Sequence, residues 1–148
     1  MCIRDRVSVV LVPPALSSVR GVAYGSGAYN ALLAGGVRGG ADDQLMRMYW
    51  GHTSRQAMRW INENAPARAR VFFQNTTRDA FEMYRREGEL RHDLRYAPHP
   101  AGSQVALIEP QKSFAELDLR VRRAYGVSGP QHLVRYQGVP MLRCYLRP

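Results

Sequence analysis

Apolar residues recur at two different spacings along the chain from about residue 52 onward. Spacings of three and four predict amphipathic helices, whereas alternation and short continuous runs predict strands. Helices are expected at residues 53–64, 77–88 and 113–126, and strands at residues 70–74, 94–97, 105–108, 132–136 and 141–146. Interleaving of this kind predicts a small layered α/β domain with a mixed β-sheet and about three helices.

Three details of this pattern predict how the strands are arranged. The uninterrupted apolar run at residues 105–108 predicts a central strand that is covered on both faces. Gln137 and Gly138 lie between two strand-like runs and predict a hairpin turn. In the last strand the apolar positions around Cys144 alternate with polar ones. We therefore expect that strand to have one buried face and one wet face.

The third helix carries its own start and stop signals. Ser113 and Glu116 have the spacing of a capping box, and Gly126 marks the end of the helix. Asp118 is expected to act as a favourable charge near the helix start. The predicted buried stripe consists of Phe114, Leu117, Val121 and Ala124.

The first 51 residues lack such a pattern. Residues 7–20 are apolar until Arg20, and they fit either the end of a transmembrane helix or a buried strand. Residues 21–51 form a Gly-rich linker, expected to be irregular with a short helix near residues 29–33, then a Gly-rich loop. The loop does not match a Walker A motif, because no Gly-Lys-Ser/Thr follows it.

Residues 1–6 stand apart from the rest. Met1-Cys2-Ile3-Arg4-Asp5-Arg6 resembles the translation of an adaptor used in sequencing libraries, so we expect an adaptor artefact there. Without these residues the formal charge falls from +9 to +8, and Cys144 is the only cysteine left. One cysteine allows neither an intramolecular disulfide nor a cysteine zinc cluster.

Composition and charge narrow the class of protein. The chain has 148 residues, of which 45% are hydrophobic, which excludes wholesale disorder. Its positive charge favours an anionic partner such as nucleic acid, a membrane surface or a phosphorylated ligand. All basic residues except Lys112 are arginines, and they are scattered rather than gathered in a tail. Codon usage in a GC-rich genome explains this excess more readily than binding does.

Residues that could carry chemistry are present but do not form a catalytic motif. The four histidines, His52, His92, His99 and His132, lack metal-ligand spacing, and no Gly-x-Ser-x-Gly elbow occurs. Cys144 is expected to be a small core residue. The adjacent Asp42 and Asp43 could bind a cation, but solvated carboxylates are the commoner case. We expect no catalytic residue and no metal site in this chain.

Several short blocks together resemble one protein family. They are Tyr29-Asn30 followed by Leu32 or Leu33, Gly35-Gly36-Val37-Arg38-Gly39, Tyr49-Trp50-Gly51, Ala57-x-x-Trp60-Ile61-Asn62 and Gly138-Val139-Pro140-Met141. This order resembles the region after the last membrane span of family 39-type membrane glycosyltransferases, which are relatives of the dolichyl-phosphate-mannose–protein mannosyltransferases. The chain departs from that pattern at Ala28, Ala31 and Met48, where an aromatic residue, a proline and an aspartate are usual.

The resemblance implies a location and a role. Residues 7–20 would be the truncated end of the last transmembrane helix, residues 21–51 a membrane-proximal linker, and residues 52–148 an extracytoplasmic domain at the inner membrane. The family transfers a sugar from a polyprenyl-phosphate donor, and its acidic catalytic residue lies upstream of this chain. The chain would then be an accessory part whose partners are the missing transmembrane domain, membrane lipid and the lipid-linked sugar. It would carry no cofactor of its own.

The resemblance also implies a binding segment between membrane and domain. Its residues would be Tyr29, Asn30, Gly35, Gly36, Arg38, Tyr49, Trp50 and Gly51. Tyrosine and tryptophan suit a membrane–water interface. An equally open reading is that these residues only pack the linker onto the first helix of the domain.

Two other functions stay open. A free-standing basic α/β module could bind nucleic acid or another anionic partner through its charge, although the scattered arginines and the missing aromatic strand motif disfavour nucleic acid. A soluble enzyme would require a deep pocket lined by Asp42, Asp43 and His52.

Overall fold

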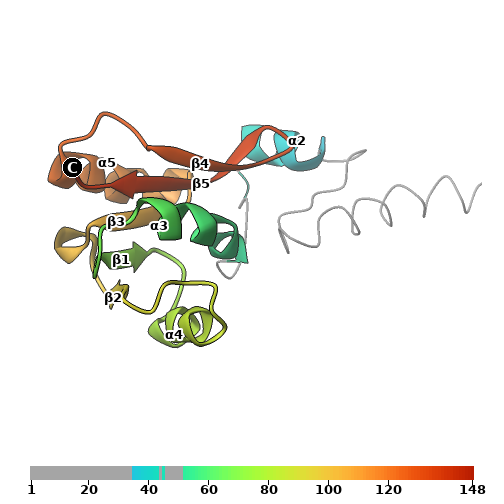
Figure 1. The fold of residues 1–148 in the computed structure, drawn as a ribbon. Coiled ribbons are helices and arrows are strands. Elements are labelled where there is room, and N and C mark those ends of the chain that lie inside the picture. The colour runs from blue at the N-terminus through green and yellow to red at the C-terminus, as the bar shows by residue number, and fades with distance from the viewer. Residues whose placement is uncertain (1–34, 44, 46–51) are drawn as a thin grey trace, which may run out of the picture.

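The computed structural model describes residues 35–43, 45 and 52–148, and these contain a five-stranded mixed sheet (Figure 1). The strands are β1 (Arg70–Phe73), β2 (Arg95–Ala97), β3 (Val105–Ile108), β4 (His132–Tyr136) and β5 (Val139–Leu146), in the spatial order β2-β1-β3-β5-β4. β1 pairs in parallel with β2 and β3, and β5 pairs antiparallel with β3 and β4. The predicted mixed sheet is confirmed.

Helices cover both faces of the sheet, so the domain has three layers (Figure 1). The helices are α2 (Gly36–Asp42), η2 (His52–Ala57), α3 (Met58–Asn64), α4 (Arg78–Arg86), η3 (Pro100–Gly102), η4 (Lys112–Phe114) and α5 (Ala115–Tyr125), where η denotes a 3-10 helix. All three predicted helices are present as η2–α3, α4 and α5. Thr77 caps α4 by accepting a hydrogen bond from the Ala80 amide at 3.3 Å.

Two hydrophobic clusters form the core, one on each face of the sheet. One joins η2, α3 and α4 to the sheet and includes Ile61, Phe73, Phe81, Leu107 and Cys144. The other lies beneath α5 and includes Phe72, Ala106, Ile108, Val121 and Tyr145. Neighbouring β3 residues therefore face opposite clusters, and all four residues of β3 are buried. The central strand predicted at residues 105–108 is confirmed.

The prediction that one face of the last strand is exposed to solvent is wrong. Tyr145 is fully buried and Arg143 is half-buried, because α5 packs over that face. The hairpin turn that precedes β5 is confirmed. Gln137 and Gly138 have φ values of 50° and 83°, as a type I′ turn requires.

The start of α5 also differs from the prediction. Its N-cap is Phe114, which makes no side-chain capping bond, and η4 precedes it in place of a capping box. Ala124 is exposed, whereas Tyr125 is buried in the stripe. The end is as predicted, since Gly126 adopts a left-handed φ of 68°.

Asp118 is more than a charge near the start of α5, because it is a buried acceptor. Its carboxylate accepts a hydrogen bond from the Tyr145 hydroxyl at 2.5 Å, and it pairs with Arg122 at 2.7 Å and Arg143 at 3.0 Å. Burial and the bond to Asp118 raise the pKa of Tyr145 to about 12. This cluster fixes α5 to the sheet through β5, with the buried charge paired on two sides.

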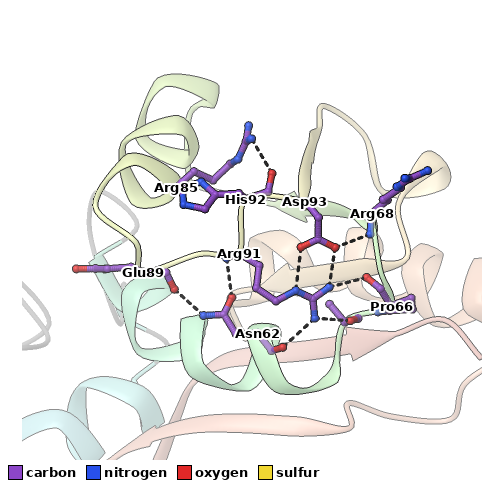
Figure 2. Close-up of polar contacts among 9 residues, drawn as sticks. Asn62, Pro66, Arg68, Arg85, Glu89, Arg91, His92 and Asp93 are labelled. Atoms are coloured by element: carbon purple, nitrogen blue, oxygen red, sulfur yellow. Dashed lines mark hydrogen bonds and ion pairs between the residues drawn. The ribbon is translucent and has the colours of Figure 1, made fainter.

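Arg91 joins the end of α3 to the segment that leads into β2 (Figure 2). Its guanidinium donates to the carbonyls of Asn62 and Ala65 at 2.9 Å and of Pro66 at 3.0 Å, and it forms a bidentate pair with Asp93. All five N–H groups of Arg91 are thereby used. We call this set of contacts the Arg91 clamp.

Two further bonds extend the Arg91 clamp. The amide of Arg68, just before β1, donates to Asp93 at 2.7 Å (Figure 2). Asn62 bonds the chain on both sides of residue 90, accepting from the Arg91 amide at 3.0 Å and donating to the Glu89 carbonyl at 2.7 Å. The hydrogen bond from Arg91 and that from the Arg68 amide lower the pKa of Asp93 well below its usual range. The clamp therefore aligns the starts of β1 and β2.

We predict that Arg91→Lys destabilises the domain, because a lysine cannot replace the planar fork that satisfies three carbonyls and Asp93. The expected loss is about 1–3 kcal/mol in the free energy of unfolding, measured by urea denaturation. Arg59→Lys is the matched control, since the Arg59 side chain is 90% exposed and pairs only with Glu63. Equal stabilities of Arg91→Lys and Arg59→Lys would contradict the role of the clamp.

Candidate functional site

The structure describes three of the eight predicted binding residues. Gly35, Gly36 and Arg38 lie at the helix α2 (Gly36–Asp42), which is found where a Gly-rich loop was expected. The other five, Tyr29, Asn30, Tyr49, Trp50 and Gly51, lie outside the described residues, as do the predicted transmembrane end at residues 7–20 and the short helix near residues 29–33.

Packing explains why a glycine-rich stretch forms a helix here. Val37 is buried against Val139 and Met141 of β5, and this contact outweighs the poor helix propensity of glycine. Gly35 precedes the helix with a φ of 63°, and a Cβ at Gly35 would lie 3.1 Å from the Gly39 Cα. Only glycine fits that close turn without strain.

α2 lies beside the turn of the β4–β5 hairpin (Figure 1). The Arg38 side chain donates from Nε to the Gln137 carbonyl at 3.1 Å. A pocket of about 320 Å³ opens between them, lined by Arg38, Ala41, Asp42, Gly138, Val139 and Pro140. The structure thus brings two of the sequence blocks that carry the family resemblance into direct contact, although about 100 residues separate them.

A second polar cluster lies where β1 and β3 end, and the sequence prediction missed it. The chain leaves β1 towards α4 on one face and leaves β3 towards α5 on the other. Such a divergence at the carboxyl ends of parallel strands is the usual ligand-binding position in open α/β sheets. The residues there are Gln74, Asn75, Thr76, Glu109 and Gln111, which we call the carboxyl-edge cluster.

Hydrogen bonds hold the carboxyl-edge cluster together. The Glu109 amide donates to the Gln74 side-chain oxygen at 2.9 Å, and the Gln111 side chain donates to Glu109 at 3.2 Å. The buried Thr76 hydroxyl donates to the buried Ser54 hydroxyl at 2.9 Å, which attaches η2 to the same edge.

Glu109 is the unusual member of this cluster. It is 2% exposed, and its Oε1 atom, like Nε2 of Gln74, has no hydrogen-bond partner among the described residues. Burial raises the pKa of Glu109, and interaction with Asn75 partly opposes that rise. A buried carboxyl with a raised pKa beside amides and hydroxyls can hydrogen-bond a polar ligand or exchange a proton with it. The signal in the sequence was a polar residue directly after each buried strand.

The other reactive side chains have structural roles. Cys144 is buried, and burial raises its pKa to about 12, so its thiolate is scarcely populated near neutral pH. The ring of His132 stacks on Trp60 at 5.4 Å, while His92 contributes its backbone carbonyl to Arg85. Cys144 is the small core residue that was predicted.

The described residues contain neither a candidate metal site nor a candidate membrane-spanning helix. No group of three or more histidine, cysteine, aspartate or glutamate side chains is placed there to hold a metal ion. No helix in that part of the chain is both long enough and apolar enough to cross a bilayer.

Comparison with known proteins adds no relative: no family model, curated protein or solved structure matches the chain. The resemblance to membrane glycosyltransferases therefore stays a prediction from sequence blocks.

We predict that Glu109→Gln raises stability at pH 7. A glutamate whose pKa is raised in the folded state stabilises the fold most when it is protonated, below its unfolded pKa of about 4.3. This stabilisation is lost as the pH rises through the folded pKa. Glutamine carries no charge at any pH, so the variant does not lose this stability at pH 7. The difference in the free energy of unfolding between variant and parent therefore shrinks as the pH falls towards 4. Chemical denaturation of both proteins at several pH values measures it.

Glu116→Gln serves as the control, because the Glu116 side chain is 85% exposed. This change is expected to stay within about 0.5 kcal/mol at every pH. A Glu109→Gln variant that is less stable than the parent at pH 7 would contradict this prediction, because it would show that the carboxylate stabilises the folded state.

Proposed function

We propose that this chain is the accessory, extracytoplasmic C-terminal part of a membrane-bound glycosyltransferase that uses a polyprenyl-phosphate-linked sugar. In this proposal the catalytic carboxylate belongs to a preceding membrane domain. The α/β domain lies on the periplasmic side of the inner membrane, close to the lipid-linked donor.

One observation carries the proposal. The Gly35–Gly39 block and the Gly138–Met141 block, both of which resemble the family, are in contact because Val37 packs with Val139 and Met141. Their contact supports a shared role for the two blocks, which is to hold the membrane-proximal linker against the β4–β5 hairpin of the domain.

This arrangement gives each part a physical role. Packing of α2 on the hairpin holds this part of the linker against the domain. Within the domain, the bond between Thr76 and Ser54 attaches η2 to the carboxyl-edge cluster. Donor and acceptor could then be positioned near the membrane by the domain while chemistry occurs upstream.

The decisive experiment reads the gene upstream of the codon for Val7 and expresses the complete product. We expect a long region with several apolar segments of about 20 residues each, and a product that fractionates with membranes. A protease added outside spheroplasts should cut the domain but spare the cytoplasmic loops.

A complete gene without such apolar segments would contradict the proposal. So would a product in which protease reaches this domain only after the cells are lysed. As a variant test in the complete enzyme, Val37→Asp should lower sugar transfer by separating α2 from the hairpin, whereas Arg59→Gln on the exposed face of α3 should not.

A further inference from the structure

A groove rich in arginine lies between α4 and the edge strand β2, outside the sites described above. Its volume is about 500 Å³, within the range of small-molecule sites. Four arginines and one glutamate are among its lining residues, namely Arg70, Arg78, Glu82, Arg85 and Arg95. Three positive charges are therefore not balanced by the acidic side chain of the groove.

Some arginines outside this groove are neutralised by an acidic partner, whereas others, such as Arg68 and Arg123, form no ion pair within the described residues. Arg55, Arg59, Arg91, Arg120, Arg122 and Arg143 each pair with a carboxylate. Within the described residues, Arg70, Arg78 and Arg95 form no such ion pair. Their guanidinium groups are exposed and available to a ligand.

The backbone forces two of these charges together. Arg70 of β1 and Arg95 of β2 are register partners in the parallel pair, and the Arg91 clamp holds the starts of both strands. Like charges on neighbouring strands repel each other and cost stability. An anion bound between them would remove that cost.

α4 supplies the other wall of the groove. Arg78, Glu82 and Arg85 are spaced by four and three residues, so they share one face of the helix. Arg85 bonds Glu82 at 2.8 Å and the His92 carbonyl at 2.7 Å, while its Nε atom is buried without a partner among the described residues. Arg85 is thus oriented by its neighbours and keeps a donor unused. Tyr96, which packs edge-to-face on Phe81, provides an apolar surface in the same groove.

We propose that this groove is a binding site for a phosphate group carried by a small ligand or a lipid headgroup. Arginine forks match phosphate oxygens in geometry, and charge-assisted bonds of this type are about twice as strong as neutral ones. The half-buried Tyr96 ring would pack against the remainder of the ligand. This proposal stands on the groove alone and goes beyond the membrane function proposed above.

The size of the groove favours a single phosphate or diphosphate over a nucleic-acid strand. A polynucleotide needs positive side chains repeated along a path of several nucleotides. Here Arg70, Arg78 and Arg95 line one compact groove, whereas arginines such as Arg59 and Arg120 are neutralised by acids on their own helices.

The test is calorimetric titration of the full chain with pyrophosphate at low salt. The variant Arg78→Gln/Arg95→Gln should weaken binding by about tenfold or more, since it removes two charge-assisted contacts. The matched control is Arg59→Gln/Arg120→Gln, which removes the same charge from exposed positions elsewhere and should leave the affinity within about twofold. Circular dichroism of both variants checks that they are folded.

Two further titrations, with phosphatidate vesicles and with a nucleic-acid duplex, identify the source of the phosphate. Binding of phosphatidate vesicles that is lost in the groove variant but retained in the control supports a lipid headgroup, and binding of pyrophosphate alone supports a soluble ligand. Three results would overturn the proposal: no binding of pyrophosphate or vesicles by the parent chain, an equal loss in both variants, or a duplex that binds more tightly than pyrophosphate and is weakened equally by both variants.

Discussion

The Arg91 clamp is the constraint on which one half of the domain depends. α3 ends at Asn64 and β1 begins at Arg70, and the carbonyls of Asn62, Ala65 and Pro66 near this connection accept hydrogen bonds from Arg91. One guanidinium supplies them, and its charge is matched by Asp93. Because Asp93 also binds the Arg68 amide, the clamp sets β2 in register with β1. By positioning β2, the clamp also positions one wall of the groove between α4 and β2.

Sequence periodicity predicted the layers well because the core is the strongest signal in a chain of this kind. The run at residues 105–108 could only be a strand buried on both sides, and Gln137-Gly138 could only suit a tight turn. The failures came from tertiary contacts. Packing of Val37 turned a glycine-rich loop into α2, and α5 covered the face of β5 that alternation had marked as wet. Asp118 lies in the first turn of α5 as expected, but its further role as a buried acceptor was not foreseen, because Tyr145 and Arg143 are more than 20 residues away.

Functional positions were harder to predict than the fold. Residues such as Glu109 and Gln74 belong to no motif, and they are brought together only because two strands end side by side and their connections diverge. The arginines of the groove likewise belong to no sequence motif. They stand out only in the structure, where one glutamate lies among four arginines. The domain thus holds its linker at one end through α2 and presents unbalanced positive charge beside α4.

The central claim is that the groove between α4 and β2, lined by three arginines without an acidic partner among the described residues, binds an anion. Titration of the ¹⁵N-labelled full chain with pyrophosphate, followed by amide chemical shifts, tests it most directly. The account predicts saturable shifts confined to the first turns of α4 and to the amides around Arg70 and Arg95. Shifts spread over exposed arginines such as Arg59 and Arg120, or centred on Gln74 and Glu109, would contradict it.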